Sequence, residues 1–211
     1  IVMGTNEVVN SGPGNGTIYN SLLTWNENGE LANHHRKLMP TYTEKLLYGM
    51  GDGAGLKAAE TSFGKIGGLI CWEHWMPLTR QAMHDSGEHI HIAVWPKVHE
   101  MLQLATRSYA FEGRCFAVAA GQIMKVKDIP DSLELLKELR DNPEHMLLNG
   151  GSSIVGPDGQ YILEPQWDKE GIFTAEVALE KCIEERMTLD VTGHYQRNDV
   201  FQLSVNKNRK H

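Results

Sequence analysis

The sequence predicts an α/β fold in which a mixed β-sheet is covered by helices on its outer side. Two observations carry this prediction. From residue 66 to residue 122, short apolar runs typical of buried strands alternate with longer stretches of helical periodicity. Before and after this region, strand-like runs are joined by turn-forming residues, which indicates antiparallel hairpins. No repeat or linker divides the chain, so we expect residues 1–211 to form one domain.

The first third of the chain is predicted to be rich in strands. β-Branched and aromatic residues gather in runs that are separated by turns at 11–16 and 26–30. The run 66–71 is apolar throughout, as expected of a strand that is buried on both faces. Strands are therefore predicted over residues 1–9, 17–25, 31–38, 57–62 and 66–71.

In the rest of the chain, helices are predicted where apolar residues recur at helical spacing. Pro77 suits the first turn of a helix. Asp131 followed by Glu134 has the spacing of a capping box, the leucines that follow share one face, and Pro143 is placed to end that helix. Helices are predicted over 77–88, 99–114, 131–142 and 178–187. Strands are predicted over 89–95, 115–122 and 171–177, with a hairpin over 151–165.

The composition is that of an ordinary globular protein. Hydrophobic residues make up 41% and charged residues 22% of 211 positions, which is enough for a sizeable core. The net charge of −7 disfavours non-specific binding to nucleic acid, which needs a basic surface. No apolar run approaches the roughly 20 residues that cross a bilayer. We therefore expect neither nucleic acid nor a membrane as a partner.

Cysteine usage points to a reducing compartment, and we expect a cytoplasmic location. Cys71, Cys115 and Cys182 are widely spaced, which argues against a disulfide framework and against a zinc site built on paired thiolates. Cys115 and Cys182 are expected to be structural. The chain begins without Met and without the basic region of a signal peptide, so an upstream targeting segment stays open.

Several motif-like stretches do not fit the sites they suggest. The glycine-rich runs lack the spacing of a dinucleotide-binding loop, and "HEMLQ" lacks the second histidine of the H-E-x-x-H zinc motif. His89 and His91 could begin a metal site. Strand alternation instead predicts that Ile90 and Ile92 face the core while both histidines line the other face. We therefore expect no metal.

Cys71 is the candidate nucleophile. It ends a buried strand just before a helix, and a sharp turn there would expose its thiol at the carboxyl edge of a sheet. A lysine and the helix N-terminus would lower the pKa of the thiol. The backbone N–H of Trp72 would be free to bind a developing anion. A second stretch, "HRKLMPTYTE", places Lys37 seven residues before Glu44. Spacing alone would make that stretch a surface strand with scattered charge.

Taken together, "HRKLMPTYTE", "FGKIGGLICWEHWMPL", "AFEGRCF" and "GHYQRNDVF" resemble the nitrilase superfamily of carbon–nitrogen hydrolases, and "CWEHWMPL" is similar to its nitrilase branch. The resemblance implies an αββα sandwich that assembles as a homodimer or a larger homo-oligomer, with no cofactor. It implies that Cys71 is the nucleophile, that Lys37 stabilises developing negative charge and that Glu44 orients the lysine and the substrate. A small organic nitrile would be the substrate and would yield a carboxylic acid and ammonia.

Aromatic residues near the cysteine are expected to bind the organic part of the substrate. Trp72 and His74 follow the nucleophile, and Trp95 ends the next strand of the same sheet. Glu73 is expected to be an internal hydrogen-bond anchor rather than a catalyst, because a buried carboxylate needs partners.

The chain departs from the family pattern at one position. The family's general-base glutamate belongs to a segment upstream of residue 1, so the chain resembles the C-terminal two-thirds of the family domain. Glu7 matches a different, structural position. The alternatives that stay open are a cyanide-hydrating or cyanide-hydrolysing enzyme, an amidase of the same superfamily, and an inactive scaffold that kept the fold.

Overall fold

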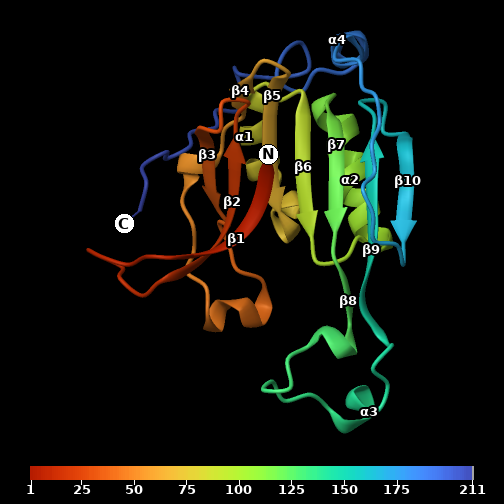
Figure 1. The fold of residues 1–211 in the computed structure, drawn as a ribbon. Coiled ribbons are helices and arrows are strands. Elements are labelled where there is room, and N and C mark those ends of the chain that lie inside the picture. Colours follow the sequence, from red (N-terminus) through yellow and green to blue (C-terminus); the bar gives the residue numbers. More distant parts are fainter. Residues whose placement is uncertain (211) are drawn as a thin grey trace.

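Residues 1–210 are described by a computed structural model in which two β-sheets lie face to face and helices cover the larger one (Figure 1). The smaller sheet is antiparallel and has the order β1–β2–β3. The larger sheet has the order β10–β9–β7–β6–β5–β4, and β8 also pairs with β9. The strands are β1 (Val2–Val8), β2 (Ile18–Trp25), β3 (Leu31–Arg36), β4 (Ala59–Thr61), β5 (Gly64–Ile70), β6 (Ile90–Trp95), β7 (Phe116–Gly121), β8 (Ile123–Lys125), β9 (Met146–Val155) and β10 (Tyr161–Trp167). The α-helices are α1 (Pro77–Asp85), α2 (Glu100–Gly113), α3 (Lys137–Arg140) and α4 (Glu180–Arg186), and the 3₁₀ turns are η1 (Tyr42–Leu46), η2 (Gly53–Gly55), η3 (Cys71–Trp75) and η4 (Val126–Asp128).

The centre of the larger sheet is parallel and carries much of the core. β5, β6 and β7 run side by side in one direction, so their carboxyl ends meet at the same edge. α1 and α2 cover one face of these strands, where Leu69 packs with Met83 and Tyr109. This is the α/β arrangement predicted from the sequence, and it explains why the strand before Cys71 is apolar throughout.

The smaller sheet packs against the opposite face. Leu22 of β2 and Ile70 of β5 belong to one buried cluster, and the partly buried Val94 packs against it. Gly68 permits this approach, because a Cβ atom there would lie only 2.7 Å from Leu22 Cδ2. The order helix, sheet, sheet matches three successive layers of the expected αββα sandwich.

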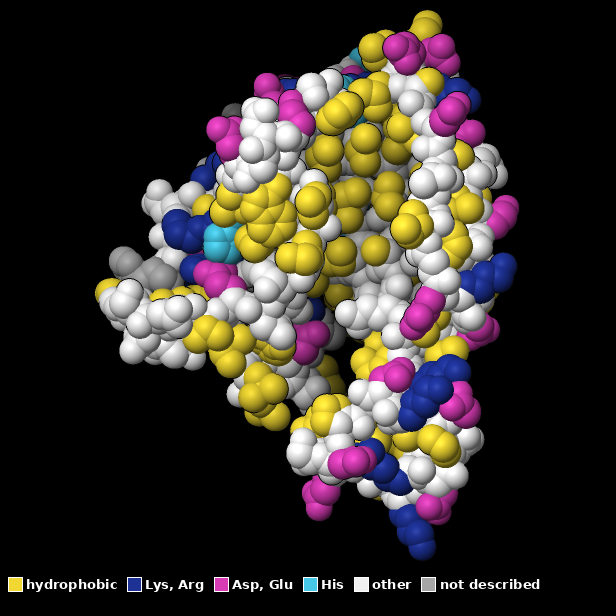
Figure 2. Space-filling view, in the orientation of Figure 1, with side chains coloured by type: hydrophobic (Ala, Val, Ile, Leu, Met, Phe, Trp, Pro, Cys, Tyr) yellow, Lys and Arg dark blue, Asp and Glu magenta, His cyan; other side chains and the backbone are white. Residues whose placement is uncertain are grey.

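Part of that opposite face is only half-buried. Ile90, Ile92 and Val118 are partly exposed, and Figure 2 shows a broad patch of hydrophobic side chains over the middle of the molecule. The orientation predicted for β6 is wrong. His91 is fully buried on the helix-covered face, while the isoleucines lie on the less covered one. The histidine tolerates this position because Glu88 is its buried hydrogen-bonding partner.

Segment 131–142 does not form the predicted amphipathic helix. Only the single turn α3 is helical, in an arm that projects from the sheets between β8 and β9 (Figure 1). Leu133 and Leu136 of the predicted apolar stripe are 56% and 71% exposed. Without a surface to bury them, this short helix lacks the packing that sustains helices in proteins. The Arg140 guanidinium instead donates to the Leu133 carbonyl and holds the segment as a loop.

Most other predicted elements are confirmed with small shifts at their ends, including the hairpin, which is formed by β9 and β10. The strand predicted over 171–177 is wrong. That segment has no strand structure, and its Ile172 is 95% exposed. Within residues 1–210, no helix combines the length and apolar character needed to span a membrane.

The C-terminal tail lies against β3 and the loop that carries η2. Arg209 is 3.2 Å from an oxygen of the buried Asp52 carboxylate, and the Lys210 backbone N–H donates to the same side chain at 2.9 Å. Arg36, at the end of β3, donates to the Lys210 carbonyl at 2.9 Å. These contacts join the last residues of the chain to the residue that precedes Lys37.

Candidate active site

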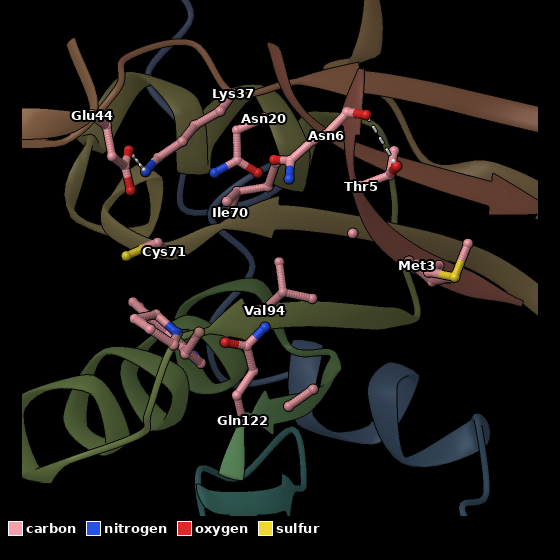
Figure 3. A pocket seen from close by; sticks show the side chains of 16 residues that line it. Met3, Thr5, Asn6, Asn20, Lys37, Glu44, Ile70, Cys71, Val94 and Gln122 are labelled. Atoms are coloured by element: carbon pink, nitrogen blue, oxygen red, sulfur yellow. Dashed lines mark hydrogen bonds and ion pairs between the residues drawn. The ribbon is translucent and has the colours of Figure 1, made fainter. Parts of the chain in front are cut away.

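A cavity of about 510 Å³ opens between the two sheets at the carboxyl ends of the parallel strands. The larger sheet contributes Cys71 after β5, Trp95 and Pro96 at the end of β6, and Gln122 after β7. The smaller sheet contributes the other wall, which includes Lys37 after β3. Figure 3 shows Lys37, Glu44, Asn20 and Asn6 along one wall, Val94 and Gln122 along the other, and Cys71 between them.

Cys71 occupies a strained backbone position. It is the first residue of η3, directly after β5, and its φ of 55° is in the left-handed region that residues with a side chain rarely adopt. A sharp strand-to-helix turn of this kind exposes a side chain at the strand end. The thiol therefore reaches the cavity from an otherwise buried strand.

Lys37 is 1% exposed and is held by two partners. Its Nζ donates to Glu44 Oε2 at 2.6 Å and to Thr41 Oγ1 at 3.0 Å. Glu44 Oε2 also accepts the Thr41 backbone N–H at 2.7 Å, as in a capping box of η1. The seven-residue spacing of the lysine and the glutamate thus places both on the cavity wall as an ion pair.

Glu73 joins the two reactive stretches. Its carboxylate accepts the backbone N–H of Leu38 at 2.7 Å and that of Ile70 at 2.8 Å, and it binds His35 Nε2 at 2.9 Å. Leu38 follows Lys37 in the chain and Ile70 precedes Cys71. One buried carboxylate therefore sets the distance between the segments that carry the lysine and the cysteine, as expected of an anchor.

The pKa of the Cys71 thiol differs in net direction from the sequence-based prediction. Burial raises this pKa, while Lys37 and the backbone amide of Trp72 lower it by a smaller amount, so the net shift is upward. The lysine and the turn act in the predicted direction. Their effect is outweighed because the thiol is largely buried, which disfavours its charged form.

The three aromatic residues predicted to bind substrate are placed differently from one another. Trp95 is 3% exposed and lines the cavity. Trp72 is 59% exposed, and His74 is buried; neither is among the residues that line the cavity. Successive side chains of a 3₁₀ turn point about 120° apart, so only one face of η3 can meet the cavity. Trp72 is exposed to solvent instead, and His74 points toward the helices, where its ring packs against Trp95 and Tyr109.

The other two cysteines are buried away from the cavity. Cys115 packs in the core under α1 and α2, and Cys182 of α4 is fully buried. All three thiols are free. Within residues 1–210, no cluster of three or more histidine, cysteine or carboxylate side chains is arranged to hold a metal ion.

A family model described as carbon–nitrogen hydrolase matches residues 1–187. The chain belongs to the carbon–nitrogen hydrolase family. An aliphatic nitrilase of Sinorhizobium fredii is 38% identical over 195 residues, which are 92% of this chain and 62% of that protein. Nitrilase 3 of Arabidopsis thaliana is 35% identical over 197 residues, which are 92% of this chain and 57% of that protein. The chain thus spans less than two thirds of the length of these relatives.

Solved structures show the same fold for this carbon–nitrogen hydrolase chain. The crystal structure of a carbon–nitrogen hydrolase from Helicobacter pylori superposes with a TM-score of 0.74 at 22% identity, covering 94% of this chain and 68% of the other. This likeness agrees with the fold predicted from the sequence.

Some cavity residues of this carbon–nitrogen hydrolase escaped the sequence analysis. Gln122 is the last residue of a predicted strand of the same parallel set, so the rule that located Cys71 and Trp95 could also have located it. Asn6 and Asn20 lie within β1 and β2. No local signal distinguishes them from other polar residues of a half-exposed sheet, because the facing of the two sheets is a tertiary property.

Proposed function

We propose that the protein is a nitrilase that converts an organic nitrile into a carboxylic acid and ammonia, with Cys71 as nucleophile. The observation that carries the proposal is the meeting of Cys71 with the Lys37–Glu44 ion pair in one cavity. The nitrilases among the relatives support the choice of a nitrile over an amide.

The proposed reaction adds the Cys71 S–H across the nitrile triple bond. Sulfur bonds to carbon, the proton ends on nitrogen, and a thioimidate forms. Water then adds to the thioimidate carbon, the C–N bond breaks, and ammonia leaves a thioester. A second water displaces the Cys71 thiol and releases the carboxylic acid. Two waters are consumed for each nitrile.

Lys37 and the Trp72 N–H are the groups proposed to stabilise negative charge in these steps. Charge builds first on the nitrile nitrogen and later on the thioester oxygen. Lys37 lines the cavity as a buried cation, and Glu44 holds its ammonium group in place. A positioned cation in a site of low polarity stabilises such charge strongly.

The proton of the Cys71 thiol needs an acceptor that this cavity does not supply. Among the described residues, Glu44 is the one carboxylate that lines the cavity, and it is bound to Lys37 and to the Thr41 N–H. The raised pKa of Cys71 strengthens this requirement. We propose that a general base from outside residues 1–210 completes the site, as the family resemblance implies.

The proposal is tested on the natural protein, purified as it occurs in the cell so that a base from outside residues 1–210 is retained. It is incubated with a panel of aliphatic and aromatic nitriles, cyanide and the matching amides. Ammonia release and the intact mass of the protein are measured for wild type and for Cys71→Ala. We expect ammonia and a covalent adduct with organic nitriles in wild type but not in Cys71→Ala. Cys182→Ala is the matched control, because it removes a thiol that is remote from the cavity.

Other outcomes of this experiment would replace the proposal. Release of amide rather than acid would indicate nitrile hydration. One relative, from Lupinus angustifolius, is named a bifunctional nitrilase and nitrile hydratase. Turnover of cyanide or amides alone would select one of those substrate classes. No adduct with any compound, together with slow alkylation of Cys71, would leave an inactive scaffold.

Self-association and a cytoplasmic location complete the proposal. Association as a homodimer or a larger homo-oligomer is checked by sedimentation of the purified protein. Location is checked by fractionating cells that express the natural protein.

A further inference from the structure

A chain of buried polar side chains runs from the backbone of Cys71 into the core under α1 and α2. His74 Nδ1 lies 2.7 Å from the Cys71 carbonyl oxygen, and His74 Nε2 lies 3.0 Å from His91 Nε2. His91 Nδ1 lies 2.9 Å from Glu88 Oε2, and the Tyr109 hydroxyl donates to the other oxygen of Glu88. All four side chains are at most 2% exposed, so this series of hydrogen bonds has no access to solvent.

Gly67 makes room for this cluster beneath β5. A Cβ atom at Gly67 would lie 1.9 Å from Glu88 Oε2, so any other residue at that position would displace the carboxylate. Gly68 faces Leu22 on the other side of the strand. The two glycines before the nucleophile therefore let Glu88 approach one face of β5 and Leu22 approach the other.

The donor and acceptor of each hydrogen bond in this series can be assigned from chemistry. A carbonyl oxygen only accepts, so His74 Nδ1 carries a proton. Burial and the neighbouring His91 lower the pKa of His74 to about 3, which leaves His74 Nε2 as an acceptor. His91 Nε2 must then donate. Burial raises the pKa of Glu88, but His91 and His84 lower it by more, so Glu88 is a carboxylate and His91 Nδ1 also donates. Both ring nitrogens of His91 are therefore assigned as donors, Nε2 to His74 and Nδ1 to Glu88.

The hydrogen bond from His74 acts on the peptide group between Cys71 and Trp72. The Cys71 carbonyl and the Trp72 N–H belong to the same peptide unit, and that N–H already lowers the pKa of the Cys71 thiol. A hydrogen bond to the carbonyl polarises the peptide and strengthens its N–H as a donor. It also holds the plane of a peptide that follows a residue with φ of 55°.

We propose that His74 is a positioning residue that orients and polarises the Cys71–Trp72 peptide, and that the His91–Glu88 pair fixes the tautomer of His74. Its consequence for catalysis rests on the proposed function, in which the Trp72 N–H binds the developing anion. The hydrogen-bond assignment itself does not depend on that function.

The assignment is tested by nitrogen NMR of the 211-residue chain with labelled histidine. At neutral pH we expect His74 to be neutral and protonated on Nδ1, and His91 to be protonated on both nitrogens. We expect the Trp72 amide proton to move upfield in His74→Leu and to recover part of its shift in His74→Asn, whose amide can donate from the position of Nδ1. A proton on His74 Nε2, or a Trp72 amide that does not respond, would overturn the proposal.

The catalytic consequence is tested by steady-state kinetics with the best nitrile. Removing an oxyanion donor outright costs about 10²–10³ in kcat. Weakening it by His74→Leu should lower kcat on the order of tenfold with little change in KM, and His74→Asn should recover most of the loss. His145→Asn, on the exposed arm, is the control. Equal loss in both His74 variants, with native thermal unfolding, would show that donation from Nδ1 is irrelevant.

If wild type turns over no nitrile, the proposed function fails. The NMR measurements then decide the hydrogen-bond assignment alone.

Discussion

At the scale of single residues, the Glu73 carboxylate has the widest influence on the site. Replacing Glu73 by Gln puts an amide NH₂ against one of the two backbone N–H groups that the carboxylate accepts. Leaving a buried donor unpaired costs roughly 1–3 kcal/mol. We expect the free energy of unfolding in urea to fall by about that amount and kcat to fall with it. Glu60→Gln, at an exposed ion pair on β4, should change neither. An unchanged stability of Glu73→Gln would contradict the anchoring role.

Lys37 should control how readily Cys71 ionises. Burial raises the pKa of the thiol and Lys37 lowers it, so Lys37→Met should raise it further. The midpoint of the pH dependence of iodoacetamide alkylation should move to higher pH, and alkylation at neutral pH should slow by about tenfold per pKa unit. Lys65→Met, which removes a remote and partly exposed lysine, is the control. A midpoint that stays in place would mean that Lys37 does not act on the thiol.

The sequence located the reactive set but not the direction of every side chain. Cys71 is recognisable from its residue type and its place at the end of a buried strand, whereas Lys37 and Glu44 are recognisable only from the resemblance of their stretch to the nitrilase superfamily. The structure places all three on one cavity. The sequence predicts His74 at the cavity, whereas the structure buries it away from the cavity lining. Which face of a short 3₁₀ turn meets a cavity depends on what packs against the other faces, and η3 gives no local sign of that.

At the scale of elements, Glu7 joins the three strands of the smaller sheet through its side-chain contacts. This residue of β1 binds Arg36 and His34 of β3 and accepts the Ser21 hydroxyl of β2. Burial raises the pKa of Glu7, but these partners outweigh it and lower the pKa from 4.5 to about 2. A group with a depressed folded pKa stabilises the fold above its unfolded pKa and loses that effect as pH falls.

Wild type should therefore exceed Glu7→Gln in stability at neutral pH. The difference should disappear as pH falls from about 4.5 to about 2, because Glu7 then becomes protonated in the folded protein too. Urea unfolding of both proteins at several pH values measures this. A difference that persists unchanged at the acidic end would show that the charge of Glu7 is not what fastens the sheet.

The arm between β8 and β9 should be dispensable for folding. Lys125 of β8 pairs with Met146 of β9, so an Asn–Gly turn can replace the residues beyond this pair and close the hairpin. Its leucines are exposed and its contacts are local. We expect the shortened protein to keep the wild-type Tm within a few degrees, as measured by circular dichroism. A collapse of Tm would reveal packing that the exposed leucines do not show. The sequence predicts too long a helix over 131–142, because an apolar stripe forms a stable helix only where other residues pack against it.

At the scale of the whole molecule, the half-buried face of the larger sheet should bind apolar probes. Ile92 and Val118 of this sheet are partly exposed. Figure 2 shows hydrophobic side chains gathered over the middle of the molecule. The native protein should enhance the fluorescence of an anionic naphthalene dye, and the double variant Ile92→Thr, Val118→Thr should reduce it. Leu104→Thr, on the exposed side of α2, is the control. Equal fluorescence in all three proteins would place the dye elsewhere. The sequence predicted this sheet correctly but reversed the faces of β6, since apolar content does not tell which side has partners.

The contacts of the C-terminal tail with Arg36 and Asp52 also have a consequence for folding during translation. Arg36 and Asp52 take partners from Arg209 and Lys210, which lie 157 to 174 positions later in the chain. A ribosome delivers the early strands first, whereas a domain generally folds as a unit. Until translation has passed residue 210, the strand that leads into Lys37 therefore lacks the contacts that the tail makes with Arg36 and Asp52. A nascent chain stalled before that point should show β3 less protected from hydrogen exchange than the released protein does.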